Sequence, residues 1–271
     1  MTYETIGTTS LDYFPCRYGA SKLLFRGPRR RLGGDYVAFL GGIETYGKFV
    51  ELPFPTLTEH ETGLRSVNLG CANVGVDAYL SDRTLIDIAS NAKVTVIQAM
   101  GAQNMSNRFY AVHSRRNDRF IRASSQLKAI YSEVDFTEFS FTRHLLTALA
   151  EVDAKRFELV ANELKEAWTA RMGALLEQLD SKVILLWLAN HAPEEGSTTS
   201  EPLFIDRTIM DRLSGKVSKV VEVVSTTQER EEGFAEMVFG PMEGPAAEEM
   251  QGPVVHQRTA AALAEAIKSL I

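Results

Sequence analysis

Apolar, β-branched segments recur along the chain and are separated by longer amphipathic stretches. Each apolar segment is continuous rather than alternating in polarity, which is typical of strands buried on both faces of a parallel sheet. The amphipathic stretches carry apolar residues three and four positions apart, the spacing of one helix face. We predict strands at residues 36–40, 65–69, 94–100, 182–188 and 217–224. We predict helices at residues 82–92, 116–133, 137–150, 154–179, 206–213, 228–237 and 259–270.

Strands that alternate with helices predict an α/β fold with three layers, α/β/α. Its centre is a doubly wound parallel sheet of about five strands. The pattern fits a single domain over residues 1–271, with an N-terminal extension at residues 1–34. Residues 102–180 form a helical insertion between the third and fourth strands. The sequence leaves open whether this insertion caps a site or forms the surface of a homo-oligomer.

Composition narrows the class of protein. Of the 271 residues, 45% are apolar and 24% charged, as in soluble globular proteins. The 29 basic and 35 acidic side chains give a net charge of −6, which argues against nucleic-acid binding. Two cysteines are too few for a disulfide scaffold. We find no signal peptide and no apolar run of membrane-spanning length, so we expect a cytoplasmic protein without membrane contact.

Charge is unevenly distributed along the chain. Residues 17–31 contain six basic side chains and no acid, whereas residues 222–249 contain eight glutamates and a single arginine. Such runs are typical of solvated faces or of intramolecular ion pairs. An anion contact on the basic segment is the alternative.

Glycine and polar residues follow each predicted strand. The segments are GGIETYG at 41–47, GCANVG at 70–75, GAQNMSNR at 101–108 and NHAP at 190–193. A loop rich in Gly and Pro then leads to His256, ahead of the last predicted helix. In open α/β sheets the ligand site lies beyond the carboxyl ends of the strands. We therefore expect a site at this edge of the sheet.

The order of these segments resembles the SGNH (GDSL-type) hydrolases. Their first block, Gly-Asp-Ser-x-Thr-x-Gly, is matched by Gly41, Thr45 and Gly47. Gly70 corresponds to the lone glycine of the second block. The resemblance implies an SGNH- or flavodoxin-like sheet and, in an intact site, ester hydrolysis by a serine nucleophile.

The third and fourth blocks depart from the family pattern. Gly101 and Asn104 match Gly-x-Asn-Asp only with one extra residue between them, and His256 matches Asp-x-x-His with Pro253 in place of the aspartate. Ile43 occupies the position of the serine. An isoleucine cannot attack a carbonyl, and a histidine without its carboxylate loses its enforced tautomer. The resemblance therefore supports the fold more than the activity. The whole chain also resembles an uncharacterised bacterial domain family.

Candidate site residues follow from these positions. His256 and Glu44 are candidates for an acid–base role and Thr45 for a substitute nucleophile, although Glu44 also fits an acid at a helix N-terminus. Asparagine amides beside glycine turns suit a carbonyl, a sugar hydroxyl or an oxyanion, or alternatively hold the loop itself. The candidate ligand-binding residues are Gly42, Ile43, Gly70, Asn73, Gly101, Asn104, Asn107, Arg108 and His191. We expect no metal and no cofactor.

Four functional hypotheses remain open. The first is a protein that binds an acylated or anionic carbohydrate-type ligand without triad hydrolysis. The second is an esterase or acyltransferase that uses Thr45, Ser106 or Cys71 as nucleophile. The third is a nucleotide- or phosphate-binding module at the Gly41–Gly42 turn, although a dinucleotide fingerprint is missing. The fourth is an interaction protein that forms a homodimer through residues 102–180.

Overall fold

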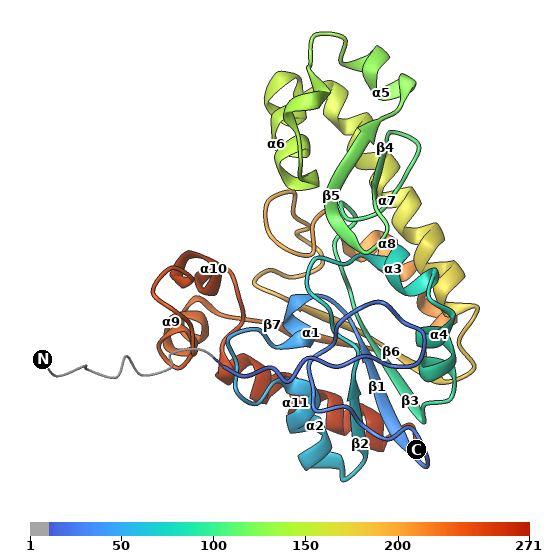
Figure 1. The fold of residues 1–271 in the computed structure, drawn as a ribbon, viewed down its shortest axis with the longest axis vertical. Coiled ribbons are helices and arrows are strands. Elements are labelled where there is room, and N and C mark those ends of the chain that lie inside the picture. The colour runs from blue at the N-terminus through green and yellow to red at the C-terminus, as the bar shows by residue number, and fades with distance from the viewer. Residues whose placement is uncertain (1–10) are drawn as a thin grey trace, which may run out of the picture.

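The computed structural model describes residues 11–271, so the first ten residues of the predicted N-terminal extension lie outside the described part. Its centre is a five-stranded parallel sheet in the order β2-β1-β3-β6-β7 (Figure 1). The strands are β1 (Tyr36–Leu40), β2 (Arg65–Asn68), β3 (Val94–Gln98), β6 (Lys182–Ala189) and β7 (Lys219–Val224). This confirms the predicted doubly wound α/β sheet, and each strand lies within a predicted apolar segment or extends it by one residue.

Helices cover both faces of the sheet because successive side chains of each strand point to opposite sides. On β1, Val37 and Phe39 face the layer of α2 (Phe54–Thr62) and α11 (Pro253–Lys268). Ala38 and Leu40 face the layer of α3 (Val76–Leu80), α4 (Arg83–Ser90) and α7 (Ala154–Leu176). All four side chains are fully buried. The strands therefore read as continuous apolar runs.

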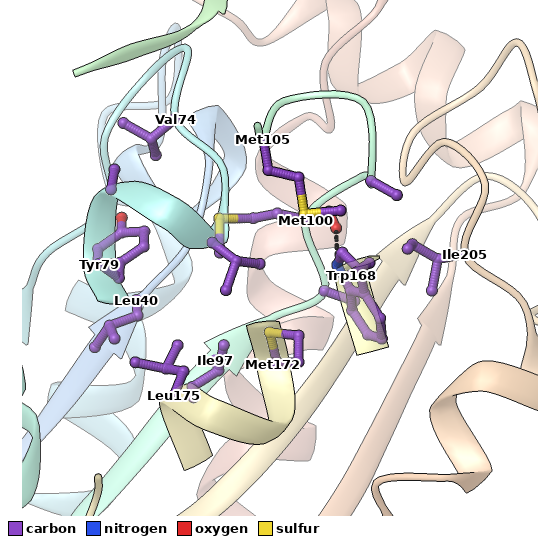
Figure 2. Packing of buried hydrophobic residues seen from close by; sticks show 14 of the residues in the cluster. Leu40, Val74, Tyr79, Ile97, Met100, Met105, Trp168, Met172, Leu175 and Ile205 are labelled. Atoms are coloured by element: carbon purple, nitrogen blue, oxygen red, sulfur yellow. Dashed lines mark hydrogen bonds between the residues drawn. The ribbon is translucent and has the colours of Figure 1, made fainter. Parts of the chain in front are cut away.

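The long helix α7 packs on this second face. Figure 2 shows Trp168, Met172 and Leu175 of α7 beside Leu40 and Ile97 of the sheet. The indole Nε1 of buried Trp168 donates to the carbonyl oxygen of Met100 at 2.8 Å. This bond ties the insertion to the loop that follows β3, which is one of the loops of the candidate site.

The segment between β3 and β6 is not wholly helical. It contains the antiparallel pair β4 (Tyr110–His113) and β5 (Arg116–Ala123), then α5 (Ser125–Ile130), η1 (Phe136–Glu138), α6 (Thr142–Val152) and α7. The predicted helix at residues 116–133 is therefore wrong over 116–123. The pairing of β5 with β4 and the packing of Phe120 on Tyr110, with ring centroids 6.2 Å apart, outweigh the local helical spacing. Association of copies through residues 102–180 stays a prediction.

The remaining helices are short, apart from α11. Asp82, the first residue of the helix predicted at 82–92, caps α4, since its side chain accepts hydrogen bonds from the backbone N–H groups of Thr84 and Leu85. The last helix begins at Pro253, six residues before the predicted start, with the proline in the first turn where its missing N–H costs nothing. His256 therefore lies inside α11. The other helices are α1 (Ile43–Tyr46), α8 (Arg207–Asp211), η2 (Ser214–Lys216), α9 (Thr227–Ala235) and α10 (Gly244–Glu248).

The uneven charge is largely used within the molecule. In the basic segment, the Arg26 guanidinium donates to three backbone carbonyls between residues 47 and 51, and Arg30 pairs with Glu59 at 2.6 Å. In the acidic segment, Glu222 pairs with Arg207 and Glu229 with Arg258. These contacts match the intramolecular pairing that the sequence suggested. Among residues 11–271, no helix is long and apolar enough to cross a membrane.

Candidate functional site

A pocket of about 260 Å³ opens at the carboxyl edge of the sheet. It lies over the neighbouring strands β1 and β3. From β1 the chain continues to β2 at one edge of the sheet, and from β3 it continues to β6 toward the other edge. This is the topological switch point where ligands bind in open α/β sheets. The lining comes from residues 42–44 after β1, residues 73 and 74 after β2, residues 98–101, 103 and 104 at the end of β3 and beyond it, and residues 188 and 190 of β6 and its loop. Arg143 of α6 and residues 200–202 and 249–251 complete it.

The side chain of Gln98, at the end of β3, fixes the turn at the floor of the pocket. Its Oε1 accepts the backbone N–H groups of Gly42 and Thr45, both at 3.2 Å, and the Thr45 hydroxyl at 2.6 Å. The first N–H groups of a helix have no partner within the helix, so this amide oxygen caps α1 from a neighbouring strand. Gln98 therefore sets the direction in which Glu44 leaves α1.

Glu44 enters the pocket from α1, and one of its carboxyl oxygens accepts a hydrogen bond. Its Oε1 accepts the backbone N–H of Gln251 at 3.1 Å, and its Oε2 lies 3.6 Å from Nε2 of His256. The Glu44 side chain is 13% exposed, whereas the His256 side chain is fully buried behind it. The ligand would meet the carboxylate and not the imidazole.

The hydrogen bonding of His256 fixes its tautomer. Nδ1 accepts the backbone N–H of Phe54 at 3.0 Å, and the two rings stack with centroids 5.6 Å apart. Since the lone pair of Nδ1 is used, the proton of the neutral ring sits on Nε2, which faces Glu44. The Nε2–H of His256 is thus directed at Glu44 without reaching hydrogen-bond distance, and the base role predicted for His256 does not fit this geometry because neither ring nitrogen offers a free lone pair.

A second carboxyl group, Glu201, enters from the loop after β6. Its Oε1 accepts a hydrogen bond from Nε2 of Gln103 at 2.7 Å and lies 3.8 Å from Nη2 of Arg143. Partial desolvation in the pocket raises the pKa of Glu201, the positive charge of Arg143 opposes this shift, and the nearby Glu44 charge adds to it. The Glu201 side chain still keeps 55% of its surface exposed, so it remains in contact with solvent in the pocket.

Asparagine side chains supply further polar groups. The Oδ1 of Asn104 accepts the Thr142 hydroxyl at 2.8 Å, and within residues 11–271 its Nδ2 has no partner. Asn73 and Asn190 are exposed and line the same pocket. A side chain at Gly75 would collide with the Asn104 carbonyl, so the loops after β2 and β3 approach each other only because this residue is glycine.

The structure brings together about half of the residues that the sequence singled out. Those that line the pocket are Gly42, Ile43, Glu44, Asn73, Gly101 and Asn104. Thr45 lies beneath it with no exposed surface, and its hydroxyl already donates to Gln98. Gly70 packs under α1 and donates its N–H to Oδ1 of Asn68, so it has no free donor for an oxyanion.

Three further predicted binding residues do not line the pocket and have structural contacts. Asn107 accepts the N–H groups of Phe109 and Tyr110 at the start of β4. Arg108 pairs with Glu163 on α7 at 2.8 Å. His191 packs edge-on against Trp187, with its Nδ1 2.9 Å from Oδ1 of Asn190, and burial lowers its pKa.

Sequence reasoning missed several lining residues. Gln98 lies inside the strand predicted at 94–100, where a glutamine in an otherwise apolar run is itself a signal of a functional or capping role. Glu201 and Gln251 lie in irregular segments far along the chain, and Arg143 lies on a predicted helix. Their positions depend on tertiary packing that no spacing in the sequence encodes.

The alternative nucleophiles are poorly placed. Burial raises the pKa of the Cys71 thiol to about 11, and Cys71 is absent from the pocket lining. The Ser106 hydroxyl accepts the N–H of Val112 and lies outside the pocket. At the Gly41–Gly42 turn, the N–H of Gly42 is occupied by Gln98, which leaves little for a phosphate to bind. Within residues 11–271, no group of three or more His, Cys, Asp or Glu side chains is arranged to hold a metal ion.

Comparisons with known proteins bear on the family. A search of curated proteins gave no match to the chain. Among solved structures, the crystal structure of the lipase Lip_vut3 from goat rumen metagenome is similar at a TM-score of 0.43 and 13% identity. That comparison covers 86% of this chain and 97% of the lipase chain. A family model described as "Domain of unknown function (DUF6473)" matches residues 1–271, so the chain belongs to this family.

Proposed function

We propose that the chain binds a small, hydroxyl-rich ligand of the carbohydrate type in this pocket, on an SGNH-like scaffold that lacks the serine nucleophile. The observation that carries the proposal is the amide-rich lining at the carboxyl edge of the sheet, with Gln103, Asn104 and Asn190 among its members. An amide both donates and accepts, as a sugar hydroxyl does, so amides and hydroxyls pair in either direction. The volume, about 260 Å³, lies near the small end of ligand pockets, which span roughly 300–1,000 Å³.

Serine-type ester hydrolysis is not part of this proposal. Ile43 lines the pocket at the position that corresponds to the serine, and His256 offers no lone pair in its direction. An acylated ligand would therefore be bound without attack by a side-chain oxygen. The anionic ligand expected from the sequence is also left out, because the pocket has three carboxyl groups (Glu44, Glu201 and Glu249) against the single Arg143.

Calorimetric titration with sorbitol and with methyl glucoside tests the proposal. We expect saturable binding of at least one of them by the full chain. The Asn190→Leu variant removes one exposed amide from the lining, and a lost hydrogen bond of about 1 kcal/mol corresponds to about fivefold weaker binding. Asn162→Leu is the matched control, since Asn162 is an exposed asparagine on α7 outside this pocket.

Two results would count against the proposal. One is the absence of binding for every polyol and sugar tested at concentrations well above the millimolar range. The other is binding that is unchanged in Asn190→Leu and weakened in Asn162→Leu, which would move the site to a different surface.

A second candidate function is proton transfer on the bound ligand by Glu44. The specific observation in its favour is that Glu44 lines the pocket while the Gln251 N–H and Nε2 of His256 approach its two oxygens. Such fixed orientation is what a general base needs. Turnover of 4-nitrophenyl glycosides that disappears in Glu44→Gln would support it, and equal turnover in that variant would refute it.

A further inference from the structure

The charges around the pocket do not balance. Glu44 and Glu249 both line it, and within residues 11–271 neither has a lysine or arginine partner there. The one basic side chain in the lining, Arg143, lies 3.8 Å from Glu201 and donates to the Thr199 carbonyl. The lining therefore carries an excess of negative charge that no described side chain neutralises.

Two buried amide oxygens add to this imbalance. Gln103 and Gln251 line the pocket and are only 3% and 6% exposed, yet Oε1 of each lacks a hydrogen-bond donor in the described part of the chain. The orientation of the Gln103 amide is fixed, because its Nε2 donates to Glu201. Buried acceptors without a donor are uncommon in folded proteins and call for an explanation.

Both observations point to the same missing chemistry, which is a positively charged group that donates hydrogen bonds. We propose that the ligand of this pocket carries an ammonium group, as an amino sugar or an amino polyol does. The inference rests on the proposed function and deepens it. An ammonium offers three donors and no acceptor, so it suits carboxylates and orphaned amide oxygens alike.

The interaction between the pocket's own carboxyl groups agrees with this. Glu44 and Glu201 line the same pocket, so their negative charges repel each other. In keeping with this, the Glu44 charge is one of the causes that raise the pKa of Glu201, after partial desolvation, which is the largest. A cation bound between carboxylates relieves such repulsion, whereas a carboxylate ligand adds to it.

Three ligands with the same six-carbon polyol chain provide the test. Glucamine ends in an ammonium, sorbitol in a hydroxyl and gluconate in a carboxylate. We expect calorimetry to show glucamine binding about tenfold more tightly than sorbitol, in line with the greater strength of charge-assisted hydrogen bonds, and gluconate binding least. The preference for glucamine over sorbitol should shrink as salt is added.

Variants identify the carboxylates involved. Glu249→Gln removes a charge from an exposed residue without an ion-pair partner, so the fold should survive, and the glucamine preference should fall about threefold or more. Glu248→Gln is the matched control, since Glu248 is an exposed neighbour outside the pocket lining, and it should leave the preference unchanged. Glu44→Gln is the second variant and should lower the preference further.

The outcomes separate this inference from the proposed function. Equal binding of sorbitol and glucamine, or tightest binding of gluconate, would refute the inference and leave the hydroxyl-binding proposal standing. Butylamine, which has an ammonium and no hydroxyl, is the fourth compound. Binding of butylamine without binding of sorbitol would refute the hydroxyl-binding proposal and leave the ammonium inference standing. Absence of binding for all four compounds would overturn both.

Discussion

Replacement of Gln98 by leucine tests the structural basis of the pocket floor. Leucine has a similar size and suits a strand that is buried on both faces, so the change removes hydrogen bonds and leaves little cavity. The side chain of Gln98 is 7% exposed and that of Thr45 is fully buried. The groups that lose their partner therefore have little access to replacement water.

The magnitude follows from the three hydrogen bonds that Oε1 accepts, from Gly42 N–H, Thr45 N–H and the Thr45 hydroxyl. At about 1 kcal/mol each, Gln98→Leu should lower the free energy of unfolding by about 3 kcal/mol. Thr45→Val alone should cost about 1 kcal/mol. In the Gln98→Leu background the same change removes a hydroxyl that already lacks its acceptor, so its cost should vanish.

Urea denaturation of the four proteins in this double-mutant cycle, followed by circular dichroism, measures these values. We expect a coupling energy of about 1 kcal/mol or more between the two positions. Differences below about 0.5 kcal/mol lie within the scatter of such a cycle. A Gln98→Leu protein whose free energy of unfolding is within about 0.5 kcal/mol of the wild type would therefore refute the assigned role of the amide. Additive losses would show that the Thr45 hydroxyl has another partner.

Two further predictions concern buried side chains near the site. His256→Leu should lower the free energy of unfolding by about 2 kcal/mol because the buried N–H of Phe54 loses its acceptor. His256→Asn should recover part of this loss, since the Oδ1 of asparagine can accept the same N–H. Equal losses for the two variants in urea denaturation would contradict this role of His256. The thiol of Cys71, with its pKa raised to about 11, is ionised in only about one molecule in a thousand at pH 8. Ellman's reagent should therefore label Cys71 slowly in the folded chain and rapidly in urea. The Cys16→Ser variant leaves Cys71 as the thiol that is measured. Fast labelling of this variant in the folded state would contradict the burial of Cys71.

The sheet was predictable because its strands are long apolar runs between turn residues, and the position of the site followed from the rule for parallel sheets. The β4–β5 hairpin was not predictable in the same way. Residues 116–123 contain four charged side chains among apolar ones, and this spacing also fits a helix. Only the partner strand at Tyr110–His113 and the packing of Phe120 decide between the two.

The candidate site was predictable as a place and not as a set of contacts. Glycine-rich loops identified the edge of the sheet, and Glu44 and Asn104 were found because they follow strands directly. Glu201 and Gln251 reach the pocket from distant segments, and the strand position of Gln98 concealed its side chain's role as a cap. The position of His256 ahead of the last predicted helix marked it as a candidate, but which ring nitrogen faces Glu44 depends on the contact with Phe54.

That orientation makes a last prediction about the serine position. In a Ser-His-Asp triad, Nδ1 of the histidine donates to the carboxylate and the lone pair of Nε2 faces the serine. In this chain Nδ1 accepts from Phe54, and the proton on Nε2 points to Glu44. Ile43→Ser would supply a hydroxyl that faces no imidazole lone pair, so we expect no labelling by a fluorophosphonate probe and no hydrolysis of 4-nitrophenyl acetate above the wild-type rate. Stoichiometric labelling of Ile43→Ser would show that His256 can turn its lone pair to the pocket, and the tautomer assigned to it would then be wrong.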